Sequence, residues 1–282
     1  MKTIVLLLLC LLPVSVYAVQ DSTANPQEEK RPLKLLHAEP LYIDLIRDLG
    51  AHKGEREWNV GMGMTDKTNF DSYEFLVEYE WAVIDRLGLE IELPVTIYTH
   101  GTANTLNGTS DLSKPSNRVE SLKMAAQYTF LVSERLRTSL AIGGITEFEF
   151  TDLNTIGREQ VFQGILYNPF LIAAKNWGSS FHTLLYTGPR ITTHFNSDQV
   201  DFAYEINSNF HYMIPGTRNF VGVEFNKIVR DANFDMVIRP QMRLTISDGL
   251  MVGIVPSIPV SRENERLGAF MRLIYEPRHH KH

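Results

Sequence analysis

The chain has 282 residues, of which 44% are hydrophobic and 21% charged, and its formal net charge at pH 7 is −6. This acidic balance argues against a nucleic-acid partner, because nucleic-acid-binding surfaces are basic. The single cysteine, Cys10, lies in an N-terminal apolar run that we expect to be removed. Disulfides, thiolate nucleophiles and cysteine-ligated metals are therefore excluded from the mature chain.

Residues 1–18 have the layout of a cleavable secretory signal peptide. Lys2 precedes an apolar run of roughly a dozen residues, and the small residues Val16 and Ala18 place the cleavage after Ala18. The run is too short for a membrane-spanning helix, which needs about 20 residues. Residues 19–32 are polar and aperiodic, so we expect a flexible leader.

The next segment, residues 33–56, carries the helical pattern of this sequence. Leu41, Leu45, Ile46 and Leu49 recur at spacings of three and four residues, and Gly50 follows them. This spacing predicts a short helix with one apolar face. The pattern leaves open whether the helix plugs a barrel, caps its periplasmic mouth or lies on the membrane.

From Trp58 onward the hydrophobic period changes to two, which indicates β-strands. The strands are expected at Glu57–Thr65, Ser72–Ile84, Gly88–Thr99, Arg118–Val132, Leu136–Phe148, Gln160–Ala174, Ser179–His194, Asp201–Met213, Asn219–Ile228, Asp235–Ile246, Leu250–Val260 and Leu267–Tyr275. Most are longer than the usual strand of about 5–6 residues and long enough to cross a bilayer at a tilt.

The connections between these strands alternate in length. Those near residues 85, 133, 176, 215 and 247 are tight, whereas those from 100, 151, 195, 229 and 261 are longer and polar. This asymmetry is typical of bacterial outer-membrane barrels. A soluble β-sandwich fits less well, because Tyr73, Phe75, Tyr79 and Trp81 all lie on one face of a single strand.

The predicted fold class is therefore all-β: a single antiparallel transmembrane β-barrel of about 12 strands with a short N-terminal helix. The barrel is expected over residues 57–276, with a tail at 277–282, in the outer membrane of a Gram-negative cell.

Charged residues alternate with the apolar ones and are expected to face the lumen, because ionised groups are costly in lipid. The predicted lumen-lining residues are Glu74, Glu78, Glu80, Glu90, Glu92, Lys123, Glu205, Glu224, Arg239, Arg243 and Arg272. Closure of the barrel would place an acidic and a basic wall on either side of the first strand. Two interpretations remain open: a transverse field that orients polar or zwitterionic solutes, or a salt-bridged lumen that only stiffens the barrel.

The block from His37 to Met64, "HAEPLYIDLIRDLGAHKGEREWNVGMGM", resembles a family of uncharacterised Gram-negative outer-membrane proteins. The resemblance implies an outer-membrane barrel and no particular activity. Many such barrels end on an aromatic residue that the insertion machinery recognises, but here Tyr275 is followed by "EPRHHKH". Either the last strand is recognised internally or the tail is an addition.

Enzymatic and metal chemistry have weaker sequence support. His100 with Ser110, and His194 with Ser197, are the His–Ser pairs that an outer-membrane lipid hydrolase could use, but no motif joins them. No catalytic residue, metal site or cofactor is therefore predicted. The expected partners are outer-membrane lipid, an unknown small solute and, during insertion, the barrel-assembly machinery.

The sequence thus predicts a passive channel for small polar or amphipathic solutes. Two alternatives remain: a closed-lumen structural or assembly component of the outer membrane, and an outer-membrane lipid-modifying hydrolase.

Overall fold

The computed structural model describes residues 31–43, 45–46, 48–100, 115–152, 160–231, 233–263 and 265–277. The predicted signal peptide, most of the leader and the tail beyond residue 277 lie outside these ranges. The described residues from Pro32 onward belong to one compact unit.

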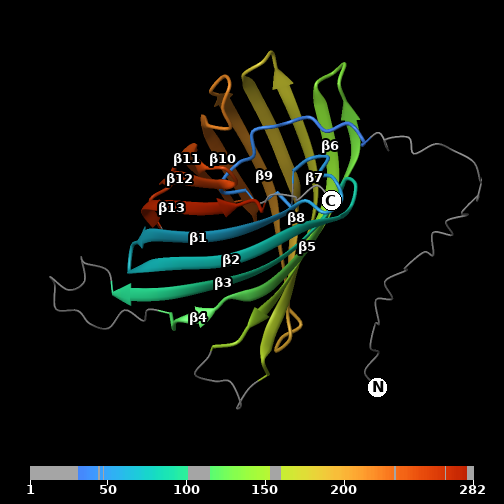
Figure 1. The fold of residues 1–282 in the computed structure, drawn as a ribbon. Helices are drawn as coiled ribbons and strands as arrows, with labels where there is room; N and C mark the ends of the chain where they lie inside the picture. Colours follow the sequence, from blue (N-terminus) through green and yellow to red (C-terminus); the bar gives the residue numbers. More distant parts are fainter. Residues whose placement is uncertain are drawn as a thin grey trace, which may run out of the picture. The chain divides into compact units, whose positions relative to one another are not determined.

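The unit is built from antiparallel strands (Figure 1). They are β1 (Arg56–Lys67), β2 (Phe70–Ile84), β3 (Leu87–His100), β4 (Arg118–Val119), β5 (Ser121–Ser133), β6 (Thr138–Phe150), β7 (Phe162–Trp177), β8 (Phe181–His194), β9 (Val200–Met213), β10 (Phe220–Arg230), β11 (Asn233–Ser247), β12 (Leu250–Pro259) and β13 (Glu265–Tyr275).

The sheet closes on itself because β13 pairs with β1, and β1 pairs with β2 on its other side. The two-residue β4 pairs only with Val95 and Thr96 of β3, and Glu120 alone separates it from β5. Twelve strands therefore form the wall and β4 is an extra one, so the predicted closed antiparallel barrel is confirmed.

Side chains alternate between the two faces of the wall, as the pleat of a β-strand requires. On β1 the outward Trp58, Val60, Met62 and Met64 are exposed, whereas the inward Asn59 is fully buried. The same alternation on the other strands makes the outer surface apolar and the interior polar. This arrangement is the reverse of that in soluble proteins and is characteristic of transmembrane barrels. Among the described residues, no helix is long and apolar enough to cross a membrane.

All connections at the end of the barrel where β1 begins and β13 ends have two to six residues. Gly178 (φ 67°) and Gly216 (φ 75°) provide the left-handed backbone conformation that two of these turns need. The two longest connections, residues 101–117 and 151–161, join strands at the opposite end, which also carries the two-residue connections 68–69 and 231–232.

The prediction of a helix over residues 41–49 is wrong for the residues that the structure describes. They form bends at 41–43 and 46 and a turn at 49–50. The physical reason is that wall side chains bind backbone amides of this segment: Gln241 accepts from Leu41, Glu224 from Ile43 and Thr129 from Gly50. Amides with such partners do not need the i−4 bonds of a helix.

Candidate functional site: a segment in the lumen and a vestibule above it

The described residues of 32–55 are here called the inner segment (blue in Figure 1), and its middle part, which contributes to two buried apolar clusters, lies inside the barrel. Leu41 and Ile46 are 1% and 0% exposed. One apolar cluster joins the segment to β5–β8 and contains Ile43, Leu45, Ile46, Leu49, Ala125, Ala141, Ile145, Phe170, Ile172, Ala174, Leu184 and Tyr186. The other joins it to β10, β12 and β13 and contains Ala38, Leu41, Phe220, Met251, Val255, Phe270 and Ile274. The segment therefore contacts opposite sides of the lumen.

Polar contacts hold the inner segment against the wall as well. The amide of Ala38 donates to Nδ1 of His182 at 2.7 Å, and His37 Nε2 lies 2.9 Å from Ser139 Oγ. Glu39 forms an ion pair with Arg243 at 3.1 Å. Because these partners come from β6, β8 and β11, the segment is fixed around much of the circumference.

The inner segment is also braced internally by Lys34, which contacts Asp48 at 2.5 Å and Glu55 at 2.7 Å. Burial alone would lower the pKa of Lys34, but the two carboxylates outweigh that effect and raise it. Lys34 therefore stays charged and ties the two ends of the segment together.

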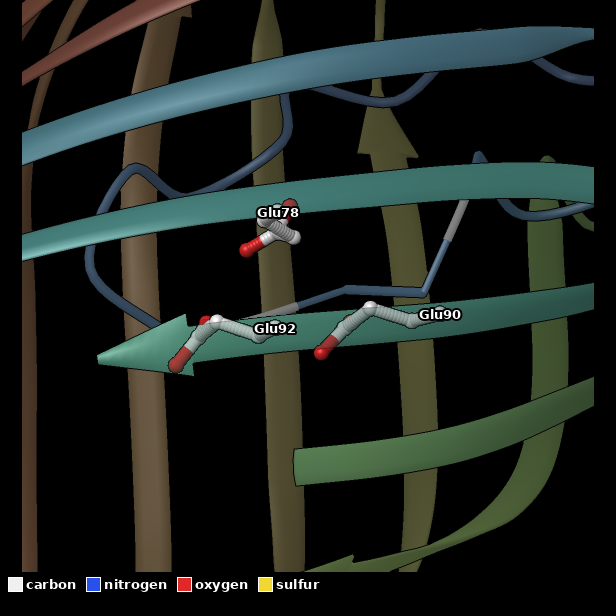
Figure 2. A group of neighbouring side chains, drawn as sticks. All are labelled: Glu78, Glu90 and Glu92. Atoms are coloured by element: carbon white, nitrogen blue, oxygen red, sulfur yellow. The ribbon is translucent and has the colours of Figure 1, made fainter. Parts of the chain in front are cut away.

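An acidic wall, defined as Glu78 and Glu80 on β2 with Glu90 and Glu92 on β3, faces the interior. Glu78 pairs directly with Glu92 across the ladder, and Glu80 with Glu90. All four are at most 6% exposed. Figure 2 shows the side chains of Glu78, Glu90 and Glu92 extending from the two neighbouring strands.

Carboxylates this close need compensating charge or hydrogen bonds. Lys123 on β5 lies 3.0 Å from both Glu90 and Glu92. Arg272 on β13 reaches across β1 to Glu78 at 3.6 Å, which barrel closure makes possible. The side-chain amide of Asn59 donates to Glu78 at 2.6 Å and to Glu80 at 3.1 Å.

Carboxylate oxygens of Glu78, Glu90 and Glu92 lie within 4.8 Å of one another, a spacing that could hold a metal ion. Since Lys123 contacts two of the three, its ammonium group already provides a cation at this place. We therefore interpret the cluster as a salt-bridged wall.

A cavity of about 600 Å³, here called the vestibule, occupies the half of the barrel that carries the longer connections. Tyr42 and Ile43 of the inner segment are among its lining residues. Six of the predicted lumen residues line it: Glu74, Glu92, Lys123, Glu205, Arg239 and Arg272. Asn168, Asn207 and Asn226 add amide groups, and the volume is that of a small-molecule site.

The other predicted lumen residues lie deeper, against the inner segment. Glu78, Glu90 and Glu224 are buried, and Glu80 and Arg243 line a cavity of only about 20 Å³. The predicted charged residues are thus divided between an open vestibule and a packed zone.

Sequence reasoning missed Tyr42, which lines the vestibule. It also missed His182 and Gln241, which accept hydrogen bonds from backbone amides of the inner segment. The inward positions of His182 and Gln241 follow from strand alternation, but their bonds to Ala38 and Leu41 join residues more than 100 positions apart. No local pattern reveals such a partner.

Of the two candidate His–Ser pairs, only His194 with Ser197 lies in the described residues, and these two side chains have other partners. His194 Nε2 contacts Asp201 at 2.9 Å, and Ser197 Oγ accepts from the amide of Gln199. Ser110 and the side chain of His100 lie outside the described residues.

Comparison with known proteins agrees with this architecture. An outer membrane channel from Pseudomonas putida F1 superposes with a TM-score of 0.58 at 13% identity, covering 83% of this chain and 100% of the channel. The NanC porin gives 0.56 at 7% identity, with 78% and 100% covered. The KdgM porin gives 0.53 at 12% identity, with 79% and 99% covered. At these identities the likeness concerns the fold.

No curated protein matches the sequence significantly. A family model does: it covers residues 33–276, which comprise nearly all of the inner segment and the complete barrel wall. The resemblance of the block at His37–Met64 to a family of outer-membrane proteins is thereby confirmed, and the chain belongs to the HAEPLYID-like family.

Proposed function

We propose that this protein is an outer-membrane channel for small polar or amphipathic solutes, closed in this conformation by its own inner segment. The observation that carries the proposal is the vestibule of about 600 Å³, which is lined by charged and amide groups and by Tyr42 and Ile43 of the inner segment. A polar cavity inside an apolar shell is what a solute pathway through a membrane requires.

Passage requires the inner segment to move. The segment continues directly into β1 at the short-turn end, so it can withdraw towards that end without opening the wall. Short turns face the periplasm in outer-membrane barrels, and the vestibule would then face the outside. Each buried aliphatic side chain of the segment stabilises the closed state by about 1.5–3 kcal/mol, so closure should dominate at rest.

The runner-up is a structural or assembly component whose lumen never opens. The observation in its favour is the pair of apolar clusters that join the inner segment to both sides of the wall. The His–Ser geometry gives a lipid hydrolase no comparable support.

A reversible disulfide between the inner segment and the barrel wall distinguishes the channel from the closed-lumen component. An ideal Cβ at Gly253 would lie 2.6–3.1 Å from side-chain atoms of Leu41. Cysteines at both positions would therefore be neighbours, and we expect them to form a disulfide under oxidising conditions. The predicted mature chain has no other cysteine. In planar bilayers we expect no current through the oxidised L41C/G253C variant and stochastic openings after reduction.

The matched control is each single cysteine variant, which should respond to neither oxidant nor reductant. Absence of current from correctly folded wild-type protein, from the reduced double variant and from a variant lacking residues 33–50 would refute the channel. Partition of the mature chain into the outer-membrane fraction, with heat-modifiable migration, tests the location.

A further inference from the structure

A smaller cavity of about 140 Å³, here called the lobe, adjoins the vestibule. Tyr42, Lys67, Glu74, Arg239 and Phe270 line both cavities. Space for the lobe exists because Gly63 has no side chain: a Cβ there would already lie 3.3 Å from Phe270 and 3.6 Å from the Cβ of Glu74. The lobe therefore opens into the proposed solute pathway.

Arg239 brings a positive charge to the lobe. Its Nε donates to Ser257 Oγ at 3.1 Å and its Nη1 to Asn226 Oδ1, while the guanidinium lies 3.5 Å from the centroid of the Tyr42 ring. Within the described part of the chain no carboxylate forms an ion pair with it, although it is only 7% exposed. Buried cations normally have an anionic partner in direct contact.

Glu74 brings the opposite charge. It lies on β2 opposite Gly63 of β1, and no hydrogen bond or ion pair of its carboxylate is found among the described residues. The other charged pair of the lobe, Lys67 and Glu265, lies 3.9 Å apart and is mutually compensated. The lobe thus offers one cation and one anion, each without a directly contacting counter-charge in the described chain.

Some other charged residues of the lumen have such contacts, whereas Glu224 is held by hydrogen bonds from Asn226 and Gln241. Arg190 binds Glu205, and Arg243 binds Glu39. Arg239 and Glu74 are distinguished because they carry opposite charges, line the same small cavity, and form no ion pair within the described ranges.

We propose that the lobe binds a small zwitterionic solute of about amino-acid size. Arg239 receives the anionic group through charge-assisted hydrogen bonds, and Glu74 receives the cationic group. The remainder of the solute projects into the vestibule, over the ring of Tyr42. This inference names the solute class for the proposed channel and rests on the vestibule being its entry.

The test uses folded full-length mature protein in detergent and three probes: L-glutamine, its methyl ester and its Nα-acetyl derivative. Saturation-transfer NMR titrations measure Kd without requiring any conduction. We expect the ester, which lacks the anion, and the acetyl derivative, which lacks the cation, each to bind about ten-fold or more weakly than glutamine.

Two variants test which residue binds the anionic group of the solute and which binds the cationic group. Arg239→Gln should weaken glutamine about ten-fold but leave the ester unchanged, and Glu74→Gln should weaken glutamine but leave the acetyl derivative unchanged. Arg135→Gln and Glu134→Gln, at exposed positions that line neither cavity, are the charge-matched controls and should bind glutamine as the wild type does.

Equal affinity for the three probes, or binding of glutamine that neither lobe variant changes, would overturn the inference. The bilayer measurements on the L41C/G253C variant test the channel, whereas the NMR titrations test the solute. Failure of one proposal can therefore be distinguished from failure of the other.

Discussion

The backbone amide of Ile43 donates a hydrogen bond to Oε1 of the buried Glu224 at 2.9 Å, although the two residues lie 181 positions apart. Gln241 donates to the other carboxylate oxygen at 2.9 Å and itself accepts from the amide of Leu41. A single network therefore connects the inner segment to β10 and β11.

Replacement of Glu224 by alanine should loosen the inner segment. The change leaves the amide of Ile43 without its acceptor, and an unsatisfied buried donor costs about 1–3 kcal/mol. Limited proteolysis should cut residues 33–50 about 5- to 150-fold faster than in the wild type. Glu224→Gln keeps a hydrogen-bond acceptor, so its cleavage rate should lie between those of the wild type and Glu224→Ala. Glu147→Ala, in the vestibule, should leave the cleavage rate unchanged.

Removing the charge of Arg272 should destabilise the closure of the barrel. Arg272→Met leaves Glu78 buried with its neighbouring carboxylates, and breaking such a pair costs about 3–5 kcal/mol. The midpoint of heat-induced unfolding, followed by electrophoretic migration, should fall. The double variant Arg272→Met/Glu78→Met should recover much of the loss. An unchanged midpoint in Arg272→Met would contradict the role of this ion pair.

Acid should weaken docking of the inner segment through His37. Burial, together with the nearby His182, lowers the pKa of His37 to about 4. The ring is therefore neutral when docked, whereas a released segment takes up a proton near pH 6.5. Docking is at full strength above about pH 6.5 and loses up to about 1.4 kcal/mol per unit as the pH falls towards 4.

The measurement is amide hydrogen exchange of residues 33–46 at pH 7.5 and 4.5, corrected for intrinsic rates. Protection should decrease at the lower pH in the wild type. His37→Gln should remove most of that difference, because glutamine does not titrate. A pH dependence that persists unchanged in His37→Gln would assign the effect to another group.

A single methyl group at Gly253 should displace the segment. Its Cβ would lie 2.6 Å from Leu41 Cδ2, closer than packed atoms allow, so Gly253→Ala forces Leu41 out of its position. Proteolysis of the inner segment should accelerate. Adding Leu41→Ala removes the clash, and the double variant should be less sensitive than the sum of the two single changes predicts.

Much of the wall could be predicted from the sequence because strand alternation is local. Glu78 and Glu92, or Glu80 and Glu90, had to come together once β2 and β3 formed a hairpin around a tight turn. The approach of Arg272 to the acidic wall followed from barrel closure, which places β13 beside β1 and within reach of β2.

The inner segment is where local patterns mislead. Leu41, Leu45, Ile46 and Leu49 have helical spacing, yet they pack against two sides of a lumen without forming a helix in the described residues. The spacing indicated that these side chains are buried. It did not determine the backbone conformation, because side chains of the barrel wall accept the hydrogen bonds of the backbone amides.

The sequence by itself determined a closed barrel with an apolar outside and a charged inside, since a period of two and alternating turn lengths are properties of neighbouring residues. Only the tertiary structure decided that the middle of the inner segment is buried in the lumen, that Lys123 contacts both Glu90 and Glu92, and that Arg239 forms no ion pair within the described chain. Those outcomes depend on which side chains meet across the barrel, and that is set by its curvature and closure, which no short stretch of sequence contains.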